Sequence, residues 1–393
     1  MTTNRAVGLA RKGEGPQRAT LLELLLDLVF VAALALTSPT LARNLDWGGI
    51  FQTLVLLMAI WWVWSVTALA TDLYHPQRPP IFLMTLWVML GTILMAAALP
   101  AAFSDHAMVF VGAYVAIHVG RGVFLASALH GRMAQLHAMR FIFWFVVSAV
   151  PWLTGGLVEG TARGLLWSAA LAIDYGTAWR RYPTPRLGRV PTSQYEVAAD
   201  HLAERYQQFF TLALGDLILV TTLIYADNEF TAGRTGALLV AVATTVLLWQ
   251  IYVHRAGALL QAAIESSHDP GRFVRSAPYT HLLMVAGVVA AAAGFEIVIA
   301  HPTEDTTPGL VGVVLGGPAL FLAGRARFEY EVFSRVSPSR LVGLLVLAVA
   351  APAMVLVPPL VVAVVGTLVL AGIAVADAVR AHGGPPEPPS PAL

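Results

Sequence analysis

Residues 81–102 read IFLMTLWVMLGTILMAAALPAA and carry no charged side chain over 22 positions. A helix of about 20 apolar residues crosses the hydrocarbon core of a bilayer, so this stretch by itself predicts a transmembrane helix. Comparable stretches lie near 21–41, 50–70, 107–128, 140–156, 161–177, 203–225, 235–254, 279–299, 308–324, 341–357 and 359–377. We therefore predict an all-α, polytopic transmembrane helix bundle of 10–12 spans, with 12 preferred.

The composition supports this class. Of the 393 residues, 57% are hydrophobic and 12% are charged, whereas about a quarter of the residues are charged in an ordinary soluble domain. A single membrane anchor would leave most of the chain polar, which the mean hydropathy of +0.71 excludes. Because the chain has no cysteine, disulfide bonds, thiolate metal sites and thiol catalysis are also excluded.

The spans predict two membrane halves separated by a polar segment. We expect five regions in chain order: a cytoplasmic N-terminal segment (1–20), a first transmembrane half (21–177), a central cytoplasmic loop (178–202), a second transmembrane half (203–377) and a disordered Pro/Gly-rich cytoplasmic tail (378–393). The first span contains Asp27-Leu28-Val29-Phe30-Val31 and the seventh contains Asp216-Leu217-Ile218-Leu219-Val220. Since six spans separate these pentapeptides, they predict two parallel six-helix halves, with chance similarity as the alternative.

The positive charges predict the orientation of the chain. Nineteen of the 24 Lys and Arg residues lie in the termini and in alternate loops. The opposite loops hold Arg43, Arg163 and Arg234, which leaves Arg121 and Arg205 inside or at the edge of the membrane. Because cytoplasmic loops carry the positive excess, we expect a multi-pass protein of the cell membrane with both termini in the cytoplasm. Short basic loops do not form a nucleic-acid surface, so the expected partners are the lipid bilayer and a small solute or ion.

Ionisable side chains within the apolar spans are the candidate site residues, since they are costly in lipid and normally face the bundle interior. On the first span, Glu23 and Asp27 are four residues apart and share one helical face. For Glu23 the alternative is a position at the membrane interface, where it complements the N-terminus of the helix. The remaining candidates for binding substrate or protons are His118, Arg121, His201, Glu204, Arg205, Asp216, His281 and Glu296.

Several of these candidates have alternative explanations. Arg121 either forms a buried ion pair with Asp27 or Asp216 or extends its charge to the cytoplasmic interface. Asp216 either binds an ion or fixes helix packing through a hydrogen bond. Three other carboxylates, Asp72, Asp174 and Asp377, are expected at solvated span ends. The pair His201-x-x-Glu204 has metal-ligand spacing but no second motif beside it, so neither a metal nor a cofactor is predicted, and no catalytic residue can be named.

Four segments resemble one bacterial family in order and spacing. They are Arg18 with Leu22–Val31, His201–Arg205 with Leu214–Asp216, Tyr279–His281 through Gly287 to His301-Pro302, and Gly316–Leu320. Together they are similar to the bacterial low temperature requirement protein A family. The resemblance implies a multi-spanning inner-membrane protein that is linked, in the founding case, to growth in the cold.

Three functions follow from these features. The first is an ion-coupled transporter of a small solute, in which Asp27 and Asp216 bind protons or a cation and nearby arginines tune their charge. The second is an intramembrane enzyme acting on a lipid or isoprenoid, with Glu23 and Asp27 as acid/base or magnesium-binding groups and Arg205 on a phosphate. The third is a membrane sensor or scaffold. We favour the transporter, and whether the protein is an enzyme is left open.

Overall fold

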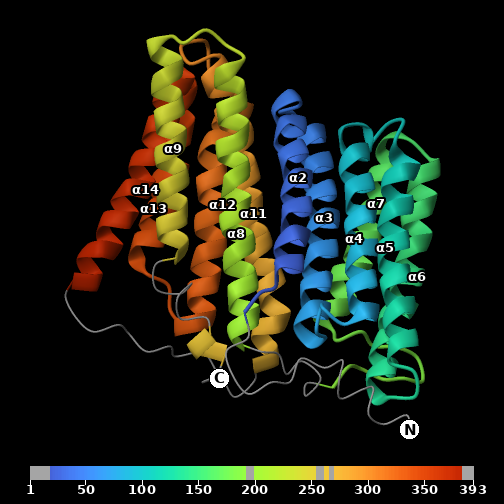
Figure 1. Cartoon of the computed structure of the whole chain (residues 1–393). Coiled ribbons are helices and arrows are strands. Elements are labelled where there is room, and N and C mark those ends of the chain that lie inside the picture. Colours follow the sequence, from blue (N-terminus) through green and yellow to red (C-terminus); the bar gives the residue numbers. More distant parts are fainter. Residues whose placement is uncertain (1–17, 192–198, 254–260, 265–269, 383–393) are drawn as a thin grey trace. The chain divides into compact units, whose positions relative to one another are not determined.

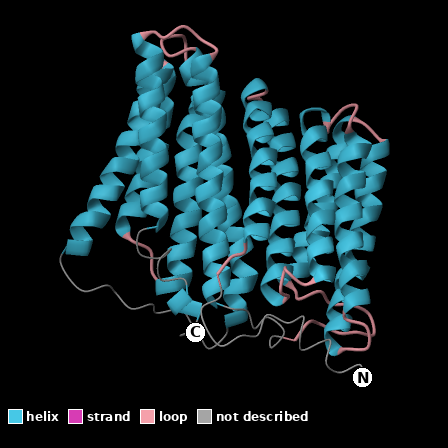
Figure 2. Cartoon of the chain, viewed as in Figure 1, coloured by secondary structure: helices cyan, strands magenta, loops and turns pink. Residues whose placement is uncertain are grey.

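The computed structural model describes residues 18–191, 199–253, 261–264 and 270–382, and most of these are helical (Figures 1 and 2). The α-helices are α2 Leu21–Arg43, α3 Trp47–Leu73, α4 Pro79–Ala98, α5 Ala107–Ala128, α6 Met133–Leu157, α7 Gly160–Trp179, α8 Ala199–Ala226, α9 Ala232–Tyr252, α11 Pro270–Ala300, α12 Pro308–Phe333, α13 Pro338–Ala350 and α14 Pro359–His382. No β-strand occurs in these ranges, and an isolated β-bridge joins Thr184 and Gly188. The predicted polytopic helical bundle is confirmed.

Each of the 12 predicted spans coincides with a helix, but several helices are longer than the apolar stretch inside them. α11 begins at Pro270 instead of near 279, and α12 continues to Phe333 instead of ending near 324. Both extensions carry arginines, which end the apolar segment that hydropathy detects. The helical backbone hydrogen bonds continue past these arginines, so the helix is longer than the predicted span. Among the helices of the described residues, 11 are long and apolar enough to cross a membrane, and α7 is not one of them.

Proline does not always end a helix in this protein. Pro151 and Pro318 lie inside α6 and α12, which continue through them. Pro100 and Pro352 instead coincide with a change to a 3-10 helix, at η1 Leu99–Ala101 and η4 Ala351–Leu356. α14 begins at a proline and extends through residues 378–382 of the predicted tail. The predicted tail residues 383–393 lie outside the described residues, as do 1–17 and 192–198.

The chain divides into two compact units. The first unit contains α4 to α7 with residues 21–36, 51–73, 199–205 and 270–275. The second unit contains α9 and α12 to α14 with residues 37–43, 47–50, 206–226 and 276–300. Four helices, α2, α3, α8 and α11, therefore contribute residues to both units. The hypothesis of two parallel repeats stays a prediction.

Large aromatic side chains fill the interior of the first unit. In this unit α4 packs on α5, α5 on α6 and α6 on α7. Trp152 and Trp167 are fully buried, with ring centroids 5.6 Å apart. A Cβ atom on Gly155 would lie 2.5 Å from the Trp167 ring, so only glycine lets this ring reach α6.

Small residues bring helices together in the second unit, where α12 packs on α13 and α14, and α14 packs on α9. A Cβ atom on Gly287 of α11 would lie 2.6 Å from the carbonyl oxygen of Gly317 on α12. A Cβ atom on Gly317 would lie 2.7 Å from the backbone nitrogen of Ala291. The two backbones are thus in direct contact, as is common for helices that associate without a hydrophobic driving force.

Candidate functional site

Five buried ionisable side chains of the first unit lie where α2 and α8 begin and where α3 ends. We call Glu23, Asp27, Asp72, His201 and Arg205 the α2–α8 ionic cluster; none of the five is more than 2% exposed. The side chain of Glu23 is completely buried, and its Oε2 also accepts a 2.8 Å hydrogen bond from the backbone nitrogen of Thr20 at the N-terminus of α2.

His201 bridges two carboxylates within this cluster. Its Nε2 lies 3.1 Å from Oε1 of Glu23, and its Nδ1 lies 2.7 Å from Oδ1 of Asp72. An imidazolium can donate both of these hydrogen bonds at once, whereas a neutral imidazole can donate one. The arrangement favours a proton on His201 held between two acids. Both ring nitrogens are engaged by carboxylates, and no group of three or more His, Cys, Asp or Glu in the described chain is arranged to hold a metal ion.

Arg205 and Asp27 form a bidentate ion pair one helical turn deeper. Nη1 and Nη2 of Arg205 donate to Oδ2 and Oδ1 of Asp27 at 2.7 and 2.8 Å. The indole nitrogen of Trp64 donates a third hydrogen bond to Oδ1 at 2.8 Å. The two contacts lie one turn apart because Glu23 and Asp27 are four residues apart on α2 and face His201 and Arg205, which are four residues apart on α8. Asp27 is therefore an ion-paired carboxylate with both oxygens engaged.

A different pair of carboxylates lies in the second unit, on α8 and α11. Asp216 is 1% exposed and accepts a 3.3 Å hydrogen bond from the hydroxyl of Ser38 at Oδ2. Its Oδ1 is buried and has no hydrogen-bond partner among the described residues, and the same holds for Oε2 of Glu296. Glu296 is close enough for its charge to repel a charge on Asp216, while Arg43 attracts Glu296. We call Asp216 and Glu296 the carboxylate pair.

Arg121 and His118 lie on one face of α5 in the first unit. Arg121 donates to the hydroxyl of Thr67 at 2.9 Å and is hydrogen-bonded to Nδ1 of His118. The expected ion pair between Arg121 and Asp27 is wrong, because Arg205 occupies both oxygens of Asp27. Arg121 does not extend to an interface either, since it is 2% exposed.

Two further candidates stabilise local structure. Glu204 accepts a 3.0 Å hydrogen bond from the backbone nitrogen of Ala19, just before α2 begins. His281 lies 3.0 Å from the carbonyl of Ala277 through Nδ1 and 3.1 Å from the hydroxyl of Tyr252 through Nε2. A neutral imidazole satisfies both contacts, which gives His281 a packing role in α11.

The expectation of solvated positions for Asp72, Asp174 and Asp377 is wrong, because their exposed fractions are 2%, 1% and 3%. Asp174 accepts hydrogen bonds from Tyr114 at 2.7 Å and Trp152 at 3.2 Å. Asp377 accepts one from Arg340 at 2.6 Å. Each carboxylate is near a helix end in the sequence, but a neighbouring helix covers it in the fold.

One ionic group was missed by the sequence analysis. Arg340 of α13 lies 3.8 Å from Glu329 of α12 and is paired with Asp377 of α14, and Glu329 also accepts hydrogen bonds from Ser337. Arg340 is one of the 19 basic residues that the sequence places in the termini and the cytoplasmic loops, so its burial, with 1% of the side chain exposed, is not expected from the sequence. The signal in the sequence that could have indicated this ion pair is Asp377, a carboxylate at the end of an apolar span that needs a basic partner if it is buried.

Comparison with known proteins identifies the family. The sequence profile of the bacterial low temperature requirement A protein (LtrA) matches residues 18–375. The chain belongs to the LtrA family. This LtrA protein is also 34% identical over 344 residues to a protein of Rhizobium meliloti (strain 1021) that is described as uncharacterized, with 86% of this chain and 83% of the relative covered. No solved structure matches it. The family match extends over the α2–α8 ionic cluster and over the carboxylate pair.

Proposed function

We propose that this LtrA protein is an ion-coupled transporter of a small solute and that the carboxylate pair Asp216 and Glu296 takes up the coupling ion. The observation that carries the proposal is the combination, in the described structure, of the buried, unpartnered Oδ1 of Asp216 with a second carboxylate, Glu296, that also has an unpartnered oxygen. Asp216 is ten residues before the end of α8 at Ala226, which places it about 15 Å from that end at about 1.5 Å per residue. The α8 sequence is apolar on both sides of this position, so we expect Asp216 inside the hydrocarbon core, nearer to the end of α8 than to its start.

The charge balance at this position supports ion uptake. A carboxylate at bilayer depth costs about 2.5–3.5 kcal/mol even on the lenient insertion scale, so it must be protonated or paired with a cation. A second carboxylate at Glu296 increases the free energy of the doubly charged state. Binding one proton or cation relieves both penalties, and releasing it restores them. Such a group can therefore couple ion movement to a change in conformation.

The α2–α8 ionic cluster has a different part in this proposal. Asp27 has its charge balanced by Arg205 and both oxygens bonded. We assign Asp27 and Arg205 to holding α2 and α8 in register, in place of the ion binding expected for Asp27. The enzymatic alternative needs Glu23 and Asp27 free to act on a lipid, whereas both already have cationic or imidazole partners. This observation favours the transporter.

The proposal also includes orientation. The positive residues of alternate loops favour a multi-pass protein of the inner membrane with both termini in the cytoplasm. α2, α8 and α11 would then all end on the outer side. The carboxylate pair lies toward these ends, because Ser38 and Glu296 are close to the last residues of α2 and α11. In this orientation the coupling ion would enter from outside the cell.

The test is solute-driven proton flux into liposomes that contain the purified protein and a trapped pH-sensitive dye. Gradients of amino acids, amines, carboxylates and sugars are applied in turn. We expect one class to drive flux in the wild type, and we expect Asp216→Asn to abolish it and Glu296→Gln to weaken it. Asp174→Asn is the matched control, since Asp174 is equally buried and also has one unpartnered oxygen, but its Oδ2 accepts hydrogen bonds from Tyr114 and Trp152 and it has no counterpart of Glu296 among the described residues. Unchanged flux in a folded Asp216→Asn protein would contradict the assignment.

A further inference from the structure

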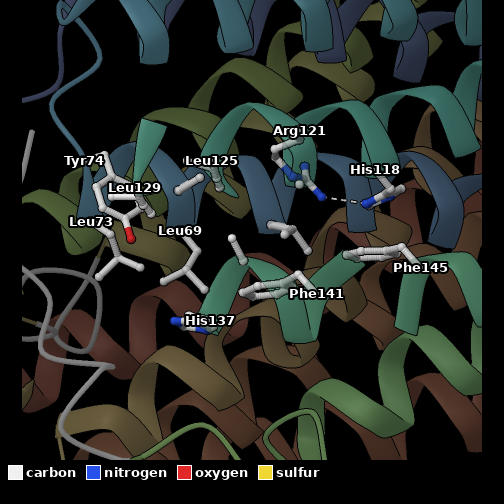
Figure 3. A pocket seen from close by; sticks show the side chains of 14 residues that line it. Leu69, Leu73, Tyr74, His118, Arg121, Leu125, Leu129, His137, Phe141 and Phe145 are labelled. Atoms are coloured by element: carbon white, nitrogen blue, oxygen red, sulfur yellow. Dashed lines mark hydrogen bonds between the residues drawn. The ribbon is translucent and has the colours of Figure 1, made fainter. Parts of the chain in front are cut away.

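The first unit contains a cavity between α3, α5 and α6 that is separate from the carboxylate pair. Its volume is about 30 Å³, and Arg121, His118 and His137 line it together with apolar side chains such as Leu125 and Phe145 (Figure 3). No carboxylate lines it. A buried water requires about 10–15 Å³, so the cavity has room for a few atoms.

The guanidinium of Arg121 meets only neutral groups. It donates to the hydroxyl of Thr67 at 2.9 Å and to the carbonyl of Val63 at 3.4 Å, and it is hydrogen-bonded to His118. The ring of Phe145 lies beneath it, 5.8 Å from the guanidinium carbon. Arg121 forms no ion pair with any described residue, although it is 2% exposed. A buried cation without a counter-charge is unfavourable by several kcal/mol.

His118 supplies a second donor at the same place. Because an arginine nitrogen can only donate, Nδ1 of His118 must accept, and the proton of the neutral ring is then on Nε2. Nε2 is buried and has no hydrogen-bond partner in the described part of the chain. One cavity is thus lined by an unpaired cation and by a histidine with an unused N–H donor.

Neighbouring titratable groups do not supply the missing negative charge. Burial raises the pKa of Tyr74 to about 12, so its phenol at one end of the cavity stays neutral. Asp174 attracts Arg121 electrostatically, but its carboxylate is bonded to Tyr114 and Trp152 and does not line the cavity. In the described structure, the cavity beside Arg121 therefore lacks a negatively charged hydrogen-bond acceptor.

We propose that this cavity binds a small monovalent anion, of the size of chloride or formate, beside the hydrogen-bonded pair Arg121 and His118. Such an anion neutralises the guanidinium and accepts the Nε2–H hydrogen bond of His118. The lining residues extend from His118 to Leu129 and Tyr74, which lie at or beyond the ends of α5 and α3. Figure 3 shows Tyr74 and Leu129 at the opposite side of the cavity from His118, so entry from these helix ends is expected. The proposal does not depend on the function of the carboxylate pair.

The first test is equilibrium binding of radiolabelled chloride to the purified protein in detergent, with gluconate as the replacement anion. We expect saturable binding in the wild type and competition by formate. Losing one partner of a buried charged contact weakens binding by about thirtyfold or more, which is the expected effect of Arg121→Gln. Arg140→Gln is the matched control, because Arg140 is also buried but donates to the carbonyl of Leu187 and does not line the cavity.

A second test needs no variant at Arg121. Bromide replaces chloride in crystals and is located by its anomalous scattering, with a peak expected inside the cavity beside Arg121 and His118. His118→Phe should weaken chloride binding while leaving Arg121 in place. The proposal is overturned if chloride binding is not saturable, if Arg121→Gln and Arg140→Gln bind alike, or if bromide occupies other positions. Stronger binding of butyrate than of formate would also overturn the stated size limit.

Discussion

The ion pair between Arg205 and Asp27 offers a quantitative test of how this bundle is held together. Replacing Arg205 by Met leaves Asp27 with the hydrogen bond from Trp64 alone and removes the cation 4.0 Å from Glu23. Since all three side chains are fully buried, no water replaces the lost charge. Breaking a buried pair from one side costs about 3–5 kcal/mol of unfolding free energy.

The double variant distinguishes pairing from general disruption. Asp27→Leu alone leaves Arg205 near Glu23, so we expect it to cost about 3 kcal/mol, at the lower end of the same range. Independent effects would make the combined loss about 6–8 kcal/mol. Because Asp27→Leu with Arg205→Met removes both charges together, we expect the double variant to lose no more than the worse single variant, a coupling of about 3 kcal/mol.

The assay is reversible unfolding of the purified protein in mixed detergent and lipid micelles, followed by tryptophan fluorescence. His301 and Glu304 form the control pair at 2.7 Å, with side chains 54% and 67% exposed. Exposed pairs contribute about 0–1 kcal/mol, so the control cycle should show little coupling. Additive losses for Asp27 and Arg205 would refute the argument that this pair joins α2 to α8.

Three other predictions concern packing and topology. Gly317→Ala should reduce the unfolding free energy by about 1–3 kcal/mol, because the added carbon strikes the backbone of α11. Gly312→Ala should be neutral or slightly stabilising, since no atom lies within 4 Å of its added carbon, and equal losses at both glycines would contradict the close contact. Arg340→Met should lower the unfolding free energy by about 3–5 kcal/mol and expose α14 to proteolysis. An unchanged unfolding free energy would contradict a stabilising pair between Arg340 and Asp377. In this cysteine-free chain, Arg186→Cys should react with an impermeant maleimide only in inverted vesicles and Asp305→Cys in intact cells; the reverse pattern would contradict cytoplasmic termini.

Much of the helical framework could be predicted from the sequence because hydropathy is a local property. Each of the 12 apolar stretches became a helix, since a backbone in lipid must satisfy its own hydrogen bonds. Boundaries were less accurate where arginines extend a helix beyond its apolar part, as at the start of α11. The pair Glu23 with Asp27 was also identified, because helical spacing places both carboxylates on one face.

The assignment of partners could not be made in this way. Asp27 and Arg205 are 178 positions apart, and nothing in the spacing along either helix distinguishes Arg205 from Arg121 as the partner of Asp27. Asp174 and Asp377 looked solvated because they are near span ends, yet neighbouring helices bury both. The pairing between α13 and α14 through Arg340 was missed for the same reason.

By itself, the sequence determined that this is an all-α, multi-spanning membrane protein, which apolar stretches form helices, and that ionisable side chains within those stretches need partners. These conclusions depend on the free energy of transferring each segment into lipid, and that quantity can be read residue by residue. Only the tertiary structure decided that Asp27 is paired, that Asp216 has an unpartnered oxygen and that Arg121 faces a cavity without an acid. The physical reason is that a buried charge is balanced by whichever helix packs against it, and packing depends on side-chain shapes brought together from distant parts of the chain.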